Sequence, residues 1–88
     1  MRIHTERCLR PVGTQEERRK ILRRIGENVR RERLRRGLSQ ERLGFEAGLH
    51  RNYIGFAERA ERSITVVNIV RIAKALRVPI QGLFRGAV

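Results

Sequence analysis

The chain has 88 residues, of which 40% are hydrophobic, and it carries 21 basic and nine acidic residues, a formal net charge of +12. This length suits one small domain, and the apolar fraction excludes a disordered chain. The positive charge favours a polyanionic partner, nucleic acid first and a membrane surface second, but it carries no information on sequence choice. The lone cysteine, Cys8, excludes an internal disulfide.

No apolar run in the sequence is long enough to span a bilayer or to act as a signal peptide. We therefore expect a cytoplasmic protein that does not associate with membranes. The sequence holds no Cys/His cluster with ligand spacing, and we expect neither a metal nor a cofactor. It also lacks a Ser/His/Asp set, a carboxylate pair or a phosphate loop, so we expect no enzyme.

The chain divides into an N-terminal arm, residues 1–13, and one domain, residues 14–88. The arm shows no periodicity and is predicted to be flexible, with Pro11 near its end. Its arginines could follow a DNA groove, although an arm without a role is the simpler interpretation.

A long helix is predicted from Thr14, which has capping-box spacing with Glu17, to about Arg36. Gly26 interrupts the pattern, so the helix could also begin near Arg24, and Gly37 is expected to end it. One apolar stripe is predicted along the helix, formed by Ile21, Leu22, Ile25, Val29 and Leu34.

The next segment predicts two short helices joined by a tight turn. Ser39 is placed to cap a helix over residues 40–47, and Gly48 suits a left-handed turn. A second helix is expected over residues 51–59, with His50 as its N-cap. Two helices crossed at such a turn can hold the second one in a DNA major groove.

Four residues of the second helix are predicted to contact bases. Arg51 and Asn52 begin the helix, where arginine can donate to guanine O6 and N7 and asparagine can pair with adenine N6 and N7. Gly55 lies on the groove side, where a missing side chain permits close approach. Phe56 could touch a thymine methyl or pack within the protein. For Arg51 and Asn52, phosphate binding or plain solvent exposure is the alternative.

Phosphate contacts are predicted at the start of the helix over residues 40–47, because free backbone N–H groups and the helix dipole attract anions there. Ser39 would then both cap the helix and bind phosphate, and Arg42 is a further candidate. The Tyr53 hydroxyl could bind another phosphate, or its ring could simply pack on the two-helix unit.

Two more helices complete the prediction. Thr65 is expected to cap a helix over residues 66–76 with four buried residues, Ile69, Ile72, Ala73 and Leu76. Pro79 suits the start of a short last helix that ends near Phe84. The predicted dimer surface lies on this helix and consists of Ile80, Leu83 and Phe84. The alternative is that these residues close the core of a single subunit.

With no competing strand pattern, the sequence predicts an all-α domain of five helices. This arrangement resembles the lambda-repressor-like, or XRE-type, helix-turn-helix family over about residues 25–84. The residues that carry the resemblance are Gly37-Leu38-Ser39-Gln40, Leu43, Ala47-Gly48-Leu49, Tyr53-Ile54, Glu58-Arg59 and Ile72-Ala73-Lys74-Ala75-Leu76-x-Val78. Within that family, residues 49–55 and 58–69 are similar to the restriction–modification controller proteins.

The resemblance implies a transcription regulator that binds double-stranded DNA at a pseudo-palindromic operator as a homodimer, with RNA polymerase as a further partner. It implies that Gln40 clamps the phosphate backbone and that Arg33 and Glu58 form a structural ion pair. It also implies that the loop after the second short helix grips the other phosphate flank through Arg62, Ser63 and Thr65.

Three residues depart from the family pattern. Ala60 stands where glycine is usual, so either it adopts a strained left-handed conformation or the loop differs here. Ala57 stands where a bulky aliphatic residue is usual near the end of the second short helix, and Phe56 beside it could refill the space. Gly44 replaces a common alanine, at up to ~1 kcal/mol of helix propensity. The alternatives to a controller protein are a general XRE-type repressor and an antitoxin-like regulator that binds a partner protein.

Overall fold

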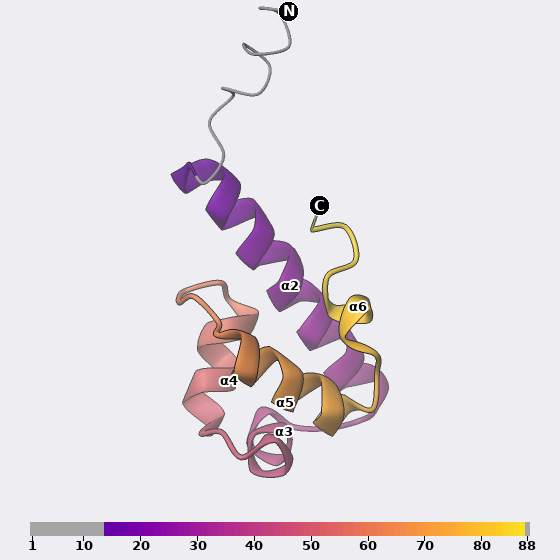
Figure 1. Ribbon diagram of the computed structural model, residues 1–88. Coiled ribbons are helices and arrows are strands. Elements are labelled where there is room, and N and C mark those ends of the chain that lie inside the picture. The colour runs from indigo at the N-terminus through magenta and orange to yellow at the C-terminus, as the bar shows by residue number, and fades with distance from the viewer. Residues whose placement is uncertain (1–13, 88) are drawn as a thin grey trace, which may run out of the picture.

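A computed structural model describes residues 14–87, and this part of the chain is helical without a strand (Figure 1). The helices are α2 (Gln15–Arg35), α3 (Gln40–Ala47), α4 (Arg51–Glu58), α5 (Val66–Leu76) and α6 (Ile80–Leu83). The predicted five-helix, all-α fold is confirmed, with helix ends within a residue or two of those expected. The arm predicted for residues 1–13 lies outside the described residues.

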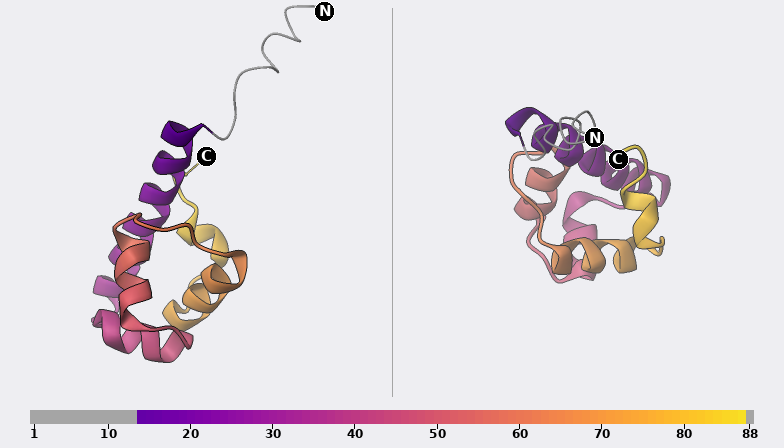
Figure 2. Two further views of the ribbon diagram at one scale, coloured as in Figure 1. Left: turned by 90° about the vertical axis from the view of Figure 1, so that its left-hand side faces the viewer. Right: turned by 45° about the horizontal axis from the view of Figure 1, so that its top comes forward.

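The helices enclose one core, to which all five contribute. Its buried residues are Ile25, Val29, Leu43, Ala47, Ile54, Ile69, Ile72, Ala73, Leu76 and Leu83. The four residues predicted to be buried on α5 are all among them. The core lies beside the C-terminal half of α2, and the N-terminal part of that helix projects beyond it in two perpendicular views (Figures 1 and 2).

Each of the four longer helices begins at a predicted N-cap residue. The hydroxyl oxygens of Thr14, Ser39 and Thr65 accept the backbone N–H three residues ahead, at 3.1, 2.9 and 3.1 Å. His50 caps α4 through Nδ1, which accepts the Asn52 N–H at 3.0 Å. Such caps satisfy backbone donors that a helix start leaves unpaired.

The ends of α2 and α3 also follow the predictions. Gly37 and Gly48 adopt φ angles of 68° and 73°, the left-handed region that a side chain disfavours. After Gly37, the Leu38 N–H donates to the Arg33 carbonyl at 3.0 Å, which closes the helix end. Ala60 has a φ of 59°, so the strained conformation expected of this alanine is present.

Two helical glycines prove to be sites of close backbone approach. A β-carbon on Gly26 would lie 2.4 Å from the Ala57 carbonyl oxygen, where α4 crosses α2. One on Gly44 would lie 2.6 Å from the Leu49 carbonyl oxygen. Gly26 therefore does not interrupt α2, and Gly44 permits contact as well as lowering helix propensity.

The apolar stripe predicted for α2 is wrong at its two ends. Leu34 is 54% exposed and Ile21 is 37% exposed, whereas Asn28 and Arg33 are buried. Ile21 lies where α2 projects past the core. The Asn28 amide donates to the carbonyl oxygens of Leu83 and Arg85, at 2.9 Å each, and so attaches the C-terminal segment to α2.

Leu83 corrects one part of the predicted dimer surface. It has no exposed area and belongs to the core, so it cannot contact a second subunit. Ile80 and Phe84 are half-buried against the same core and keep part of their surface accessible. No helix in residues 14–87 is both long and apolar enough to cross a membrane.

Candidate nucleic-acid interface

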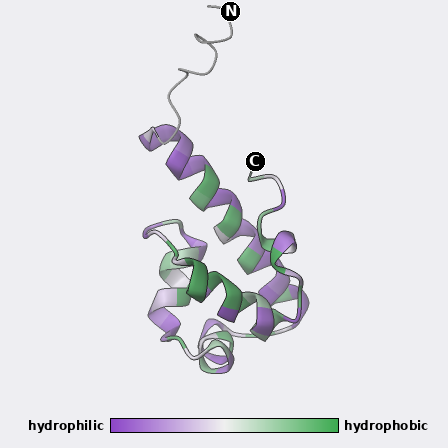
Figure 3. Ribbon diagram, viewed as in Figure 1, coloured by the Kyte–Doolittle hydropathy of each residue, from purple (hydrophilic) through white to green (hydrophobic). Residues whose placement is uncertain are grey.

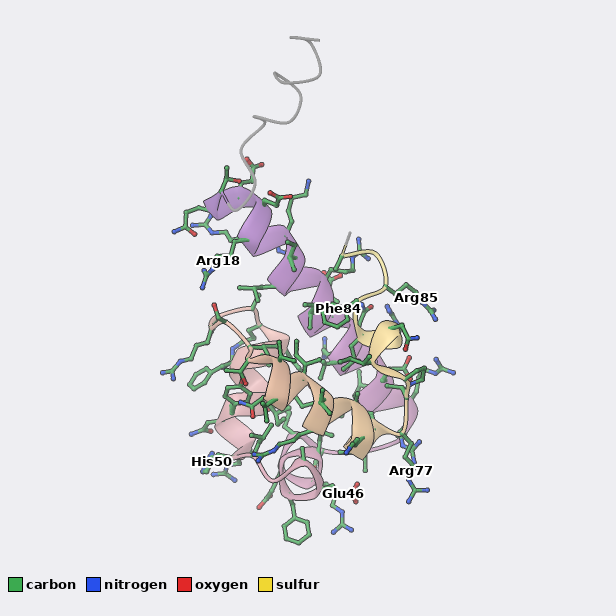
Figure 4. The ribbon with its side chains drawn as sticks, viewed as in Figure 1. Arg18, Glu46, His50, Arg77, Phe84 and Arg85 are labelled. Atoms are coloured by element: carbon green, nitrogen blue, oxygen red, sulfur yellow. The ribbon has the colours of Figure 1, made fainter. Side chains whose placement is uncertain are left out.

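The end of α4 that the sequence predicts to enter DNA is open to solvent. Arg51 and Asn52 are both exposed, and they follow directly on the His50 cap. His50 marks this end of the helix at the edge of the molecule (Figure 4). Gly48 turns the chain there and α3 packs against α4, so the fold sets where the backbone of Arg51 and Asn52 lies.

Gly55 is not an open groove position. It is buried, and a β-carbon there would meet the side chains of Arg59, with Nη1 at 3.0 Å, and Gln40, with Oε1 at 3.4 Å. The prediction that the bare backbone of Gly55 faces DNA is therefore corrected: two polar side chains of the protein cover it. Both are flexible ends, and they fill the space that the missing side chain leaves.

Phe56 is half-buried between two arginines. The Arg62 guanidinium lies 4.4 Å from the ring centroid and that of Arg59 lies 5.6 Å away, both within cation–π range. Arg59 also donates to both carboxylate oxygens of Glu61, at 3.0 and 3.3 Å. This hydrogen bond lowers the pKa of Glu61 and raises that of Arg59. The Arg62 side chain therefore stacks on the Phe56 ring, next to the Arg59–Glu61 pair.

The start of α3 keeps its capacity to bind an anion. Ser39 is exposed and accepts the Arg42 N–H, which leaves its own hydroxyl hydrogen available to donate. The Gln40 side chain donates to the Glu58 carboxylate at 3.1 Å, which joins α3 to α4. Arg42 is engaged on its own helix by Glu46 at 2.8 Å, so it is less available to phosphate than predicted.

The Tyr53 hydroxyl is enclosed by the protein and has no hydrogen-bond partner within residues 14–87. It cannot reach a phosphate in this conformation, which corrects the predicted contact in favour of the packing alternative. A buried donor without a partner costs about 1–3 kcal/mol.

The α4–α5 loop, residues 60–65, exposes the three residues predicted to grip phosphate, Arg62, Ser63 and Thr65. Thr65 is also the N-cap of α5, where its hydroxyl oxygen accepts the Asn68 N–H. The hydroxyl of Ser63 receives a hydrogen bond from the Arg18 guanidinium of α2. Arg18 points from α2 toward this loop (Figure 4). The contact joins residues 45 positions apart and was not visible in the sequence, where Arg18 is one of many arginines.

The predicted ion pair of Arg33 and Glu58 is confirmed. Arg33 Nε lies 2.6 Å from one carboxylate oxygen and Nη2 lies 3.0 Å from the other, and both side chains are nearly inaccessible. Arg33 Nη1 also donates to the Leu38 carbonyl at 2.9 Å. The pair therefore fixes α4 against α2, and it holds the end of α2 as well.

Comparison with known proteins agrees with this geometry. The helix-turn-helix family profile matches residues 29–83. Control protein C.SmaI of Serratia marcescens is 46% identical over 59 residues, which cover 67% of this chain and 70% of that protein. Control protein C.BamHI of Bacillus amyloliquefaciens is 48% identical over 55 residues, 61% and 68% of the two chains.

The fold is likewise similar to solved structures. The restriction–modification controller protein C.AhdI from Aeromonas hydrophila superimposes with a TM-score of 0.70 and 43% identity, over 72% of this chain and 96% of that chain. The resemblance predicted from the sequence is confirmed. The chain belongs to the XRE-type helix-turn-helix family of DNA-binding transcription regulators, with restriction–modification controller proteins among its relatives.

Proposed function

We propose that this protein is a homodimeric controller of restriction–modification genes that binds a pseudo-palindromic operator in the cytoplasm. The observation that carries the proposal is the exposed pair Arg51 and Asn52 at the start of α4, on a chain 46% identical to a control protein. Side chains of these types can read guanine and adenine edges in the major groove. Operator position would decide whether RNA polymerase is recruited or blocked.

In the proposed complex, base contacts and phosphate contacts come from separate elements. Arg51 and Asn52 supply sequence choice, and Phe56 can add an apolar contact from its exposed edge. Ser39 at the start of α3 and Arg62 and Ser63 in the α4–α5 loop hold the phosphate backbone on either side of the groove. Most of the affinity would then come from phosphates and most of the specificity from α4.

The proposed dimer surface combines α5 and α6. Val66 and Val67 are 72% and 59% exposed, and with the half-buried Val70 they form one apolar face of α5. Figure 3 shows the apolar character of α5 as green ribbon. Adjacent exposed apolar residues favour a protein contact. With Ile80 of α6 and Phe84, which directly follows that helix, they would pair two subunits whose α4 helices enter major grooves about 34–36 Å apart.

Selection of bound sites from random duplexes by the full chain tests this function. We expect an enriched site with two inverted half-sites about one helical turn apart. Enrichment of a single half-site would contradict the dimer. No enrichment, together with capture of a protein partner that blocks DNA binding, would favour an antitoxin-like role.

A further inference from the structure

We infer that the N-terminal part of α2 is an additional phosphate-binding surface, formed by Arg18, Arg19 and Arg23, that continues the DNA contact of the α4–α5 loop. This inference rests on the proposed DNA complex and adds a contact to it. The matched family profile begins at residue 29, so this surface lies outside the part of the chain that the helix-turn-helix match covers.

The N-terminal part of α2 continues the helix beyond the core. α2 is one continuous helix from Gln15, with Thr14 capping its start at 3.1 Å. Ile25 is the first of its residues to enter the core, and the ten residues before it extend about 15 Å at 1.5 Å per residue. The projecting part in Figures 1 and 2 is therefore helical and continuous with the folded domain.

One side of the projecting part of α2 is turned toward the end of α4. The missing β-carbon of Gly26 points at the Ala57 and Glu58 carbonyls at the end of α4, at 2.4 and 2.6 Å. Arg23 and Arg19 precede Gly26 by three and seven residues, so they lie on the same side of α2, one and two turns further out. This side faces the end of α4 and the loop that follows it.

A direct contact joins the N-terminal part of α2 to the α4–α5 loop. The Arg18 guanidinium donates to the Ser63 hydroxyl in the α4–α5 loop, beside the stacked Arg62. A phosphate held by this loop would therefore lie next to Arg18. The basic surface of α2 and the proposed phosphate grip are continuous.

Charge identifies the occupant. Residues 15–24 hold five basic and two acidic side chains, a surplus of +3. Arg19 and Arg23 are exposed, and no ion pair occupies either of them among residues 14–87. Unpaired arginines beside a nucleic-acid interface suit phosphodiester oxygens, which they can bind bidentately.

The test compares two double variants of the full chain that remove equal charge from different sides of the same helix segment. R19Q/R23Q changes the side that faces α4, and K20Q/R24Q changes positions about 100° further round the helix, away from the Gly26 contact with α4. Binding to a 30-bp random-sequence duplex is measured as a function of salt, and thermal unfolding checks that both variants fold. Light scattering records the mass of each variant.

We expect R19Q/R23Q to lower the slope of log K against log salt by about 0.9 for each lost phosphate contact, and to weaken binding at ~0.1 M salt by about tenfold. K20Q/R24Q should leave the slope near that of the parent. On the selected operator, R19Q/R23Q should also remove hydroxyl-radical protection of sugars beside the α4–α5 loop.

Equal slopes for the two variants would overturn the inference, because the charges would then act as a general field. A halved mass with an unchanged slope would also overturn it and assign this face to a protein contact. Failure of the proposed function is a separate result: the parent chain would show no preferred site in the selection, while the comparison of slopes on random duplex would still decide this inference.

Discussion

Arg51 occupies the position on which the proposed sequence reading depends. It is exposed, it begins α4, and the His50 cap fixes the backbone beside it. We predict that Arg51→Ala reduces discrimination between the operator and other duplexes by about 1–3 kcal/mol, the value of one bidentate base contact. Binding titrations on the selected operator and on random duplex measure this difference.

Arg42→Ala is the matched control, because Arg42 is also exposed and basic but is paired with Glu46 on its own helix. It should weaken binding to both duplexes slightly and equally. If Arg51→Ala weakened both duplexes by the same factor, Arg51 would be a phosphate contact and the assignment of specificity to the α4 tip would be wrong.

The Arg33–Glu58 pair is a second point at which one residue matters to the whole domain. Both side chains are buried, and the carboxylate also accepts from Gln40. We predict that Arg33→Ala lowers the free energy of unfolding by about 3–5 kcal/mol, because Glu58 is left buried without its cation. Urea unfolding measures the change.

Glu27→Gln is the control for this prediction, since Glu27 pairs with Arg24 at 3.8 Å on an exposed surface. Its loss should cost less than about 1 kcal/mol. A comparably small loss for Arg33→Ala would mean that packing alone, rather than the ion pair, holds α4 against α2.

At the scale of elements, the crossing of α2 and α4 depends on Gly26. Alanine there would gain about 1 kcal/mol in helix propensity, but its β-carbon would lie 2.4 Å from a backbone carbonyl that cannot move freely. We predict a net destabilisation of about 1–3 kcal/mol, the usual cost of overpacking. Denaturant unfolding with an unchanged m-value would report it.

Gly55→Ala provides the contrast within α4. Its β-carbon would meet the mobile ends of Arg59 and Gln40 at 3.0 and 3.4 Å, so these side chains can shift. We expect stability to stay the same or to rise by up to about 1 kcal/mol. If Gly26→Ala raised stability as much as Gly55→Ala, the Gly26 backbone could not lie in close contact with the Ala57 carbonyl.

The elements that the sequence predicts well are those set by local chemistry. Ser39, His50 and Thr65 cap helices, and Gly48 makes the turn, because hydrogen-bonding side chains and positive φ angles act within a few residues. The ion pair of Arg33 and Glu58 was identified from family resemblance, since nothing local links residues 25 positions apart.

What the sequence did not predict depends on how elements meet in space. Leu83 has the same apolar character as its neighbours, and whether it is buried or exposed follows from the docking of α6. The Tyr53 hydroxyl is enclosed by packing that no spacing pattern specifies. Arg18 is distinguished by its hydrogen bond to Ser63, a contact that only the folded chain brings together.

At the scale of the whole molecule, the proposed DNA contacts and the proposed dimer surface lie on different elements. The residues proposed to read bases begin α4. The exposed valines lie on α5, which directly follows the loop proposed to grip phosphate. A dimer formed through α5 would therefore fix the distance between two α4 helices. Operator spacing and subunit pairing would then be determined by one rigid domain.

The last prediction concerns this pairing. We expect the parent chain to run at twice the mass of one chain in light scattering, and its unfolding midpoint to rise with protein concentration because association stabilises the folded state. V66S/V67S should shift the mass toward one chain and weaken operator binding, because it removes apolar area from α5. Phe45→Ser is the control, since Phe45 is 75% exposed but lies on α3 rather than on α5, and it should leave the mass unchanged. A monomeric parent at high concentration would contradict the dimer, and a V66S/V67S variant that still pairs would place the interface elsewhere than on α5.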